Sequence, residues 1–413
     1  MKRMKFLGLT ALSVLLGFTM MISWEIPAES AEGKIVIGMV ESISGALKDQ
    51  GERFVLGARY TIDEINAKGG LLGKEVVLVV EDSTYKPDVA VRKATKLVLE
   101  DKADILVGGL GSHICLAMAK AAEKNKKIFV VINSQADSIT GKDFNPYVFR
   151  TTTTTGQRTS AVISYFAKYT KHKKYYILCQ DFALGREGGE GYKDNLNRIP
   201  GAQLVGEDYH PLMLKDFSPY VSKIIASGAE VVLTTDLGPD LSNLVKTGAS
   251  LGWKAITAGG YMFDPVMMRD IGEAALGHLI VHHSLVDFSN PVQKKFVQDY
   301  QEKHKHLDKV LYSALFGVSD AYNSIQWLFD VIKRVGSTDS EKLIKGWEGA
   351  SYIMPWGKVT MRACDHQIIT PYRAAVVVRE NEYFSFPYTG KQVVIPEEEV
   401  TVPPARTGNP RCK

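Results

Sequence analysis

Apolar and polar positions alternate in blocks from Ile35 onward, and the period of the pattern changes from block to block. Residues 35–40 and 76–80 are continuous apolar runs, which are typical of strands covered by helices on both faces. Between them, apolar residues recur at 3-4-3 spacing, which indicates one buried helix face. These residues are Val55, Ala58, Ile62 and Ile65. The pattern predicts a strand, a helix and a second strand of a parallel sheet.

The same alternation continues to Arg150. Pro87 suits the first turn of a second helix, and Ser112 is a favourable residue at the start of a third. Further strands are predicted at 105–107, 128–132 and 148–149. This series predicts a doubly wound α/β lobe with right-handed crossovers.

A threonine run at 151–155 interrupts the series and predicts a crossover into a second lobe. Strands predicted for that lobe lie at 175–178, 203–205 and 231–233, with a short one from Ile256. We expect lobe 1 to hold 34–150 with 281–350, and lobe 2 to hold 151–280 with 351–390. Residues 391–413 read as an extended C-terminal tail, because prolines interrupt them. Three crossings between two α/β lobes predict a hinge and a cleft.

The first 30 residues have the three parts of a secretory signal: a basic start, an apolar stretch and a small-x-small cleavage site at 28–30. No cysteine precedes Cys115, so we expect a cleaved, exported protein and no lipoprotein anchor. The net charge of +4 over 413 residues is small and scattered, which argues against a nucleic-acid partner.

Four cysteines in an exported chain invite pairing. Cys115 and Cys179 fall in predicted core elements, whereas Cys364 and Cys412 both lie in the C-terminal region. We therefore predict a disulfide between Cys364 and Cys412.

Motifs that carry chemistry are scarce. The glycine-rich stretch 185–191 lacks the Gly-Lys-Ser/Thr ending of a phosphate loop. The histidine clusters at 282–283 and 304–306 are interpreted as core or solvated residues. We expect no catalytic residues, no metal and no cofactor.

The predicted binding site lies at the carboxyl ends of the strands, where open α/β sheets bind ligands. Ser112 and His113 begin a helix whose first amides lack internal partners, so a ligand carboxylate could bind there. The loop of Ser134, Gln135 and Ala136 follows the next strand. Lobe 2 would close over the ligand with Phe182, Leu184, Asp236 and Tyr261.

The segments 38–82, 216–220 and 357–367 resemble the solute-binding proteins of ABC importers, in particular the Leu/Ile/Val-binding branch of the type I periplasmic binding proteins. The resemblance implies two lobes closing over one small molecule. It also implies that Ser112 and the 134–136 loop match the positions that hold an amino acid's carboxylate. The implied partner is a membrane permease, and we expect a monomer.

Lobe 2 departs from that pattern. Amino-acid-binding members commonly have a tyrosine where Leu184 stands, and a glutamate near Gly259 that meets the ammonium group. This chain has no acid at 258–260, and a buried ammonium without counter-charge is costly. We therefore expect an aromatic or other organic acid, with a hydrophobic or branched-chain amino acid as the first alternative and an amide or urea-like solute as the second.

Two other functions stay open at this point. A sensor presenting its ligand to a receptor would use the same fold. A hydrolytic enzyme on an α/β scaffold would need a nucleophile and a base that converge, and His113 is the only histidine near Ser112 in the sequence.

Overall fold

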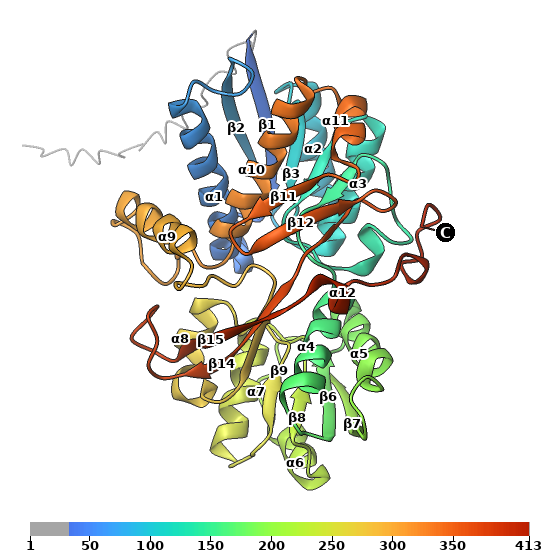
Figure 1. The fold of residues 1–413 in the computed structure, drawn as a ribbon, viewed down its shortest axis with the longest axis vertical. Helices are drawn as coiled ribbons and strands as arrows, with labels where there is room; N and C mark the ends of the chain where they lie inside the picture. The colour runs from blue at the N-terminus through green and yellow to red at the C-terminus, as the bar shows by residue number, and fades with distance from the viewer. Residues whose placement is uncertain (1–32, 413) are drawn as a thin grey trace, which may run out of the picture.

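The computed structural model describes residues 33–412. The predicted signal sequence lies outside the described residues. Two α/β lobes stack along the long axis of the molecule (Figure 1). Within the described residues, no helix combines the length and the apolar character that crossing a membrane requires.

Lobe 1 is built on an eight-stranded sheet in the order β11-β12-β13-β5-β4-β3-β1-β2. The strands from β13 to β2 run parallel, whereas β11 and β12 are antiparallel additions. The strands are β1 (Lys34–Glu41), β2 (Glu75–Asp82), β3 (Ile105–Gly108), β4 (Phe129–Val131), β5 (Val148–Arg150), β11 (Ser351–Met354), β12 (Gly357–Arg362) and β13 (Gln367–Ile369).

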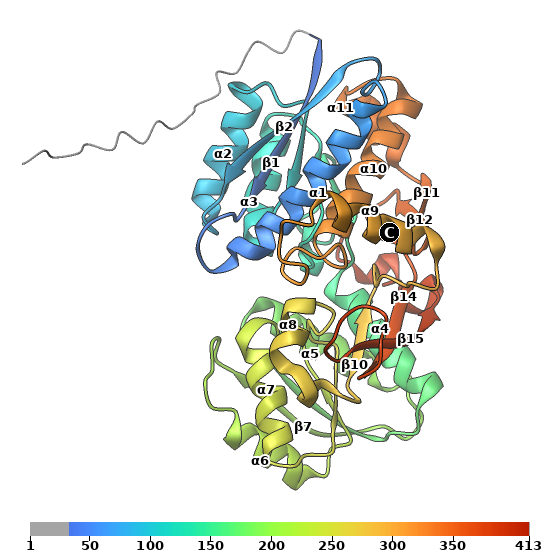
Figure 2. The same ribbon diagram turned by 90° about the vertical axis from the view of Figure 1, so that its left-hand side faces the viewer.

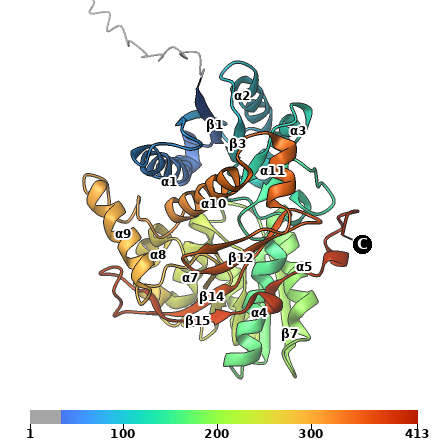
Figure 3. The ribbon, with the colours of Figure 1, turned by 45° about the horizontal axis from the view of Figure 1, so that its top comes forward.

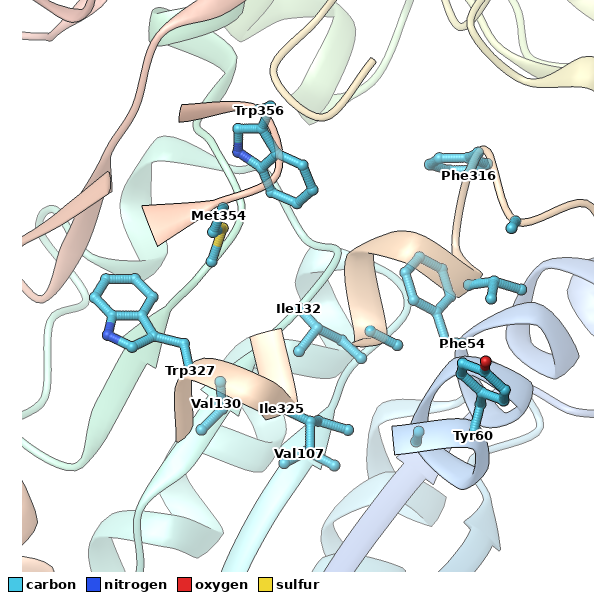
Figure 4. Close-up of a cluster of buried hydrophobic side chains, with 14 of the residues drawn as sticks. Phe54, Tyr60, Val107, Val130, Ile132, Phe316, Ile325, Trp327, Met354 and Trp356 are labelled. Atoms are coloured by element: carbon cyan, nitrogen blue, oxygen red, sulfur yellow. The ribbon is translucent and has the colours of Figure 1, made fainter. Parts of the chain in front are cut away.

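Helices cover both faces of this sheet. The helices of lobe 1 are α1 (Lys48–Ala67), α2 (Pro87–Leu99), α3 (Ser112–Lys124), α9 (Pro291–Lys303), α10 (Val318–Val335) and α11 (Ser340–Trp347). Helices α1 and α10 lie side by side (Figure 3). The core between them and the sheet buries aromatic and aliphatic side chains from distant parts of the chain, including Phe54, Val107, Ile325 and Trp327 (Figure 4).

Lobe 2 has a seven-stranded sheet in the order β15-β14-β10-β9-β8-β6-β7. Its strands are β6 (Lys174–Gln180), β7 (Gln203–His210), β8 (Val231–Leu233), β9 (Ile256–Ala258), β10 (Leu279–His282), β14 (Tyr372–Val378) and β15 (Tyr388–Ile395). Its helices are α4 (Thr155–Tyr169), α5 (Ala183–Leu196), α6 (Ser218–Ser227), α7 (Gly238–Ser250), α8 (Pro265–Ile271) and α12 (Glu397–Val400). Figure 2 shows α7 and α8 on the side of lobe 2 that faces the viewer.

The two-lobed α/β fold is as predicted, but two of the expected boundaries are wrong. Residues 351–369 belong to lobe 1, because β11 and β12 form a hairpin and β13 pairs with β5 through Gln367 and Arg150. Strand β10 belongs to lobe 2, so the chain returns to lobe 1 only after His282. An alternating pattern identifies a strand without showing which sheet edge it joins, and this explains the first error.

The expected tail is also partly regular. Strand β15 pairs with β14 up to Ile395, and α12 packs against α4. The remaining tail segment (401–412) crosses back to lobe 1, where Asn409 Nδ2 donates to the Thr140 carbonyl at 2.9 Å. The predicted Cys364–Cys412 disulfide is present in the structure. The chain therefore crosses between the lobes at 151–154, 283–290, 370–371 and in the tail segment.

Candidate functional site

A glycine turn joins β3 to α3 at the end of lobe 1 that faces lobe 2. Gly109 and Gly111 have φ values of 92° and 97°, a region that favours glycine. A Cβ atom on Gly109 would lie 2.3 Å from Cys115 Sγ, and one on Gly111 would lie 2.7 Å from Tyr85 Cε2. The turn therefore depends on glycine, and it delivers Ser112 as the first residue of α3.

The two predicted segments of lobe 1 lie together. Ser134 Oγ donates to the Gly109 carbonyl at 2.6 Å, and the Ala136 amide donates to Ser112 Oγ at 3.2 Å. Buried Arg150 fixes the loop from behind, since its Nη1 donates to the Ala136 carbonyl at 2.6 Å. The first amides of α3 thus lie beside the polar 134–136 loop, which these hydrogen bonds fix in place. That arrangement suits an anion.

A buried acid that sequence reasoning missed lies behind this turn. Glu41, at the end of β1, accepts from the Leu110 amide at 3.2 Å and from Asn133 Nδ2 at 3.3 Å. Burial raises the pKa of Glu41 to about 8, against these hydrogen bonds, which lower it. Its carboxyl group is therefore mostly neutral at neutral pH and adds little negative charge. His113 is exposed and packs against Tyr85, with 4.7 Å between ring centroids.

The predicted residues of lobe 2 have different positions. Phe182 and Leu184 begin α5 and are half-buried. Three residues further on, Glu187 Oε2 accepts from the amide of Asp137 in lobe 1 at 3.3 Å, which brings α5 against the 134–136 loop. Asp236 is fully buried and lies 2.9 Å from His210 Nε2. This partner makes Asp236 unsuitable as the counter-charge of a ligand ammonium.

Arg158 in α4 connects the predicted residues of the two lobes, although sequence reasoning missed it. It is 1% exposed, and its Nη2 donates to the side chain of Gln135. Its guanidinium carbon lies 4.4 Å from the ring centroid of Tyr261 and 5.7 Å from that of Phe263. A lone arginine after a threonine run looks like a surface residue. Only the packing of α4 against the site reveals its position.

A second buried guanidinium joins the lobes directly. Arg53 of α1 donates through Nη1 and Nη2 to the two carboxylate oxygens of Asp264, both at 2.9 Å. Asp264 also caps α8 by accepting from the Val266 amide at 3.0 Å. Both side chains of the pair are almost fully buried. Lobes 1 and 2 therefore contact each other tightly on the α1–α8 side.

A cavity of about 430 Å³ lies on the other side, between α4, α5 and the tail segment. Acidic and basic side chains line it together, among them Asp137, Glu187, Arg186 and Arg406. The acids nearest the site already accept from main-chain amides. Asp137 Oδ1 bonds the Gly156 amide at 3.1 Å, and Glu187 bonds Asp137 as described above.

The hydroxyl groups of the site have no activating base in the part of the chain that the structure describes. Ser112 and Ser134 hydrogen-bond to backbone groups and to Asn133, and neither bonds a histidine. The one cluster of potential metal ligands within 33–412 is Cys364, Asp365 and Cys412. Its two sulfur atoms are joined in the disulfide, so it does not form a metal site.

Two hinged α/β lobes with polar strand ends directed at each other define a two-lobed solute receptor. The sequence profile of the periplasmic binding protein family matches residues 34–382, and the chain belongs to that family. It is 24% identical over 387 residues to Leu/Ile/Val-binding protein homolog 4 of Brucella abortus (strain 2308), with 88% of this chain and 91% of the relative covered.

Solved structures share the fold. The closed form of a leucine-, isoleucine-, valine-, threonine- and alanine-binding protein from Brucella ovis superimposes with a TM-score of 0.79 at 22% identity, covering 90% of this chain and 97% of the other. A solute-binding protein of an ABC transporter from Rhodopseudomonas palustris BisB5, in complex with 3,4-dihydroxybenzoic acid, gives 0.77 at 21% identity, covering 90% and 100%.

Proposed function

We propose that this protein is the periplasmic solute-binding subunit of an ABC importer. It captures a small carboxylate-bearing solute between its lobes and delivers it, unmodified, to a membrane permease. The observation that carries this proposal is the joint geometry of the α3 turn and the 134–136 loop. Ser134, Gly109, Ser112 and Ala136 are tied by two hydrogen bonds, and the free amides of α3 lie beside them.

The charges around the site support an organic acid as the solute. The raised pKa of Glu41 leaves its carboxyl mostly neutral, Asp264 is paired with Arg53 and Asp236 lies against His210. None of these three groups is free to balance a ligand ammonium. Related structures bind an aromatic acid in one case and amino acids in another, and the charges here favour an organic acid over an amino acid.

A thermal-shift and calorimetry screen of the mature protein tests the proposal. Benzoate-type acids should raise the melting temperature by mass action, and L-leucine should bind more weakly or not at all. Ser112→Ala should weaken binding of the best acid about 10-fold or more, because it removes one charge-assisted hydrogen bond. Full affinity in that variant, or the absence of binding by every acid and amino acid, would contradict the proposal.

A further inference from the structure

Arg158 in α4 is a buried cation without a counter-charge. Within residues 33–412, no carboxylate oxygen lies within 4.0 Å of its guanidinium, whereas Arg53, Arg362 and Arg373 each have one. Buried Arg150 also lacks one in this range, but its three guanidinium nitrogens all donate hydrogen bonds, which is not true of Arg158. Its Nε is buried and has no hydrogen-bond partner. Arginine keeps its charge in proteins, and a buried charge normally has an ionic partner.

The groups that surround Arg158 are neutral. His282 and His283 are both almost fully buried. Burial, and secondarily the nearby Arg158, lowers the pKa of His283 to about 3. Burial, followed by His283 and then Arg158, also lowers the pKa of His282. Tyr261 and Phe263 offer ring faces, which attract a cation but cannot neutralise it. The side chain of Gln135 supplies one acceptor. The surroundings therefore accommodate the guanidinium without balancing its charge.

Arg158 also has the right position for a ligand contact. Gln135, its hydrogen-bond partner, belongs to the lobe 1 loop beside Ser112, and Tyr261 belongs to the loop that follows β9 in lobe 2. The guanidinium thus lies where loops of the two lobes meet. An anion placed there would contact Arg158 as well as the loop that Ser112 and Ser134 hold in place.

We infer that Arg158 is the specificity-determining residue of this site: it binds the anionic group of the solute and selects organic carboxylates that carry no ammonium group. The inference rests on the proposed binding function and deepens it. It assigns the negative end of the solute to a side chain of α4 in addition to the α3 turn. An amino acid would bring its ammonium close to this unbalanced cation, and the nearest acids, Asp137 and Glu187, already accept from main-chain amides.

The test compares the mature protein with Arg158→Met, Arg158→Lys and the control Arg198→Met. Arg198 lies in the same lobe, half-buried, and bonds Ser160 and Ser164 away from the site. The probes are 4-hydroxybenzoate, its neutral amide 4-hydroxybenzamide, benzoate and L-leucine, measured by calorimetry. Wild type and Arg198→Met should prefer the acid to the amide by about 100-fold; Arg158→Met should abolish this preference, and Arg158→Lys should keep part of it.

The melting temperature of the ligand-free variants gives a second readout. If Arg158 serves binding and does not stabilise the fold, the melting temperature of Arg158→Met should be no lower than that of wild type. The reason is that the substitution removes an uncompensated buried charge. A merely structural arginine would lower the melting temperature and leave the acid preference intact, and that result would overturn the inference.

Two further outcomes separate the inference from the proposed function. Tight binding of L-leucine but no acid would overturn the assignment of Arg158, while solute binding itself would stand. In that case, Asp137 and Glu187 would be the candidate partners of the leucine ammonium group. Binding of none of the four probes would overturn the inference together with the proposed function.

Discussion

At the residue scale, Glu41 shows how burial sets the charge of a site. Its side chain is fully buried and receives two hydrogen bonds, yet desolvation outweighs them and its pKa is raised from 4.5 to about 8. Between these two values the unfolded chain has released the proton that the folded chain still holds. The free energy of unfolding therefore falls as pH rises through this window.

Glu41→Gln should remove this pH dependence. Relative to wild type, the variant should gain stability between about pH 5 and pH 8, by up to about 4 kcal/mol at the upper end. Urea unfolding of both proteins at the two pH values measures the difference, and taking a difference cancels the other titrating groups. A constant difference across the window would show that Glu41 is ionised in the folded protein.

The position of a residue could be predicted where it follows from the chain around it, while its role in binding stays a prediction. Ser112 follows a strand and a glycine turn, so its place at the start of α3 could be inferred. Its contact with the loop at Ala136 followed from strand order. Asp236 lies in the loop after β8, but its partner His210 ends β7, and no local pattern shows that pairing. Arg158 was missed for the same reason.

At the scale of elements, the β3–α3 turn depends on space as well as on backbone conformation. Gly109 and Gly277 both have positive φ values, 92° and 81°. A Cβ on Gly109 would meet Cys115 at 2.3 Å, whereas one on Gly277 would meet nothing within 4 Å. The two glycines therefore separate backbone strain from steric overlap.

Alanine at each position should show this difference. Gly277→Ala should lower the free energy of unfolding by about 1–2 kcal/mol from backbone strain alone. Gly109→Ala should lower it by about 1–3 kcal/mol more, because Cys115 and its neighbours must shift to make room for the methyl group. Chemical denaturation of the two variants measures both losses. Equal losses would mean that Cys115 and its neighbours move aside without cost.

Elements also show what periodicity leaves undetermined. The continuous apolar runs of β1 and β2 identified a parallel sheet. Strand β1 is buried on both faces, whereas β2 lies at the sheet edge and is mostly half-buried. Strand β13 has only three residues, Gln367–Ile369, and joins lobe 1 through one paired position with Arg150. The sheet that β13 joins could not be inferred from so short a pattern. The predicted lobe boundary at 351 was wrong for this reason.

At the scale of the whole molecule, the Arg53–Asp264 pair connects α1 of lobe 1 with the start of α8 in lobe 2. Removing the guanidinium leaves the buried Asp264 carboxylate without its ionic partner, which costs about 3–5 kcal/mol, and opening the lobes relieves that cost. Arg53→Met should therefore increase the radius of gyration of the ligand-free protein in small-angle scattering.

Arg269→Met is the matched control, since Arg269 pairs with Asp308 of lobe 1 at 3.5 Å while both side chains are largely exposed. Exposed pairs contribute little, so this variant should scatter like wild type. An unchanged radius in Arg53→Met together with lower stability would mean that the α1–α8 contact does not open.

The disulfide fixes the end of the tail segment, which comes from lobe 2, to lobe 1. Cys364 and Cys412 are 48 residues apart, and the loop-entropy model assigns such a cross-link about 4 kcal/mol. Dithiothreitol should lower the urea midpoint of wild type and leave that of Cys364→Ser/Cys412→Ser unchanged. Cys115 and Cys179 are buried thiols whose pKa values burial raises to about 12, so they should not react. An unaffected wild type would contradict this assignment.

Residues 364–412 form a covalent ring, and this ring passes through both lobes. It leaves lobe 1 at 370–371 and returns to it along the tail segment. Rotation about a line through these two arms leaves the length of each arm unchanged, whereas twisting one lobe against the other would have to lengthen at least one of them. The ring therefore favours a single axis of opening.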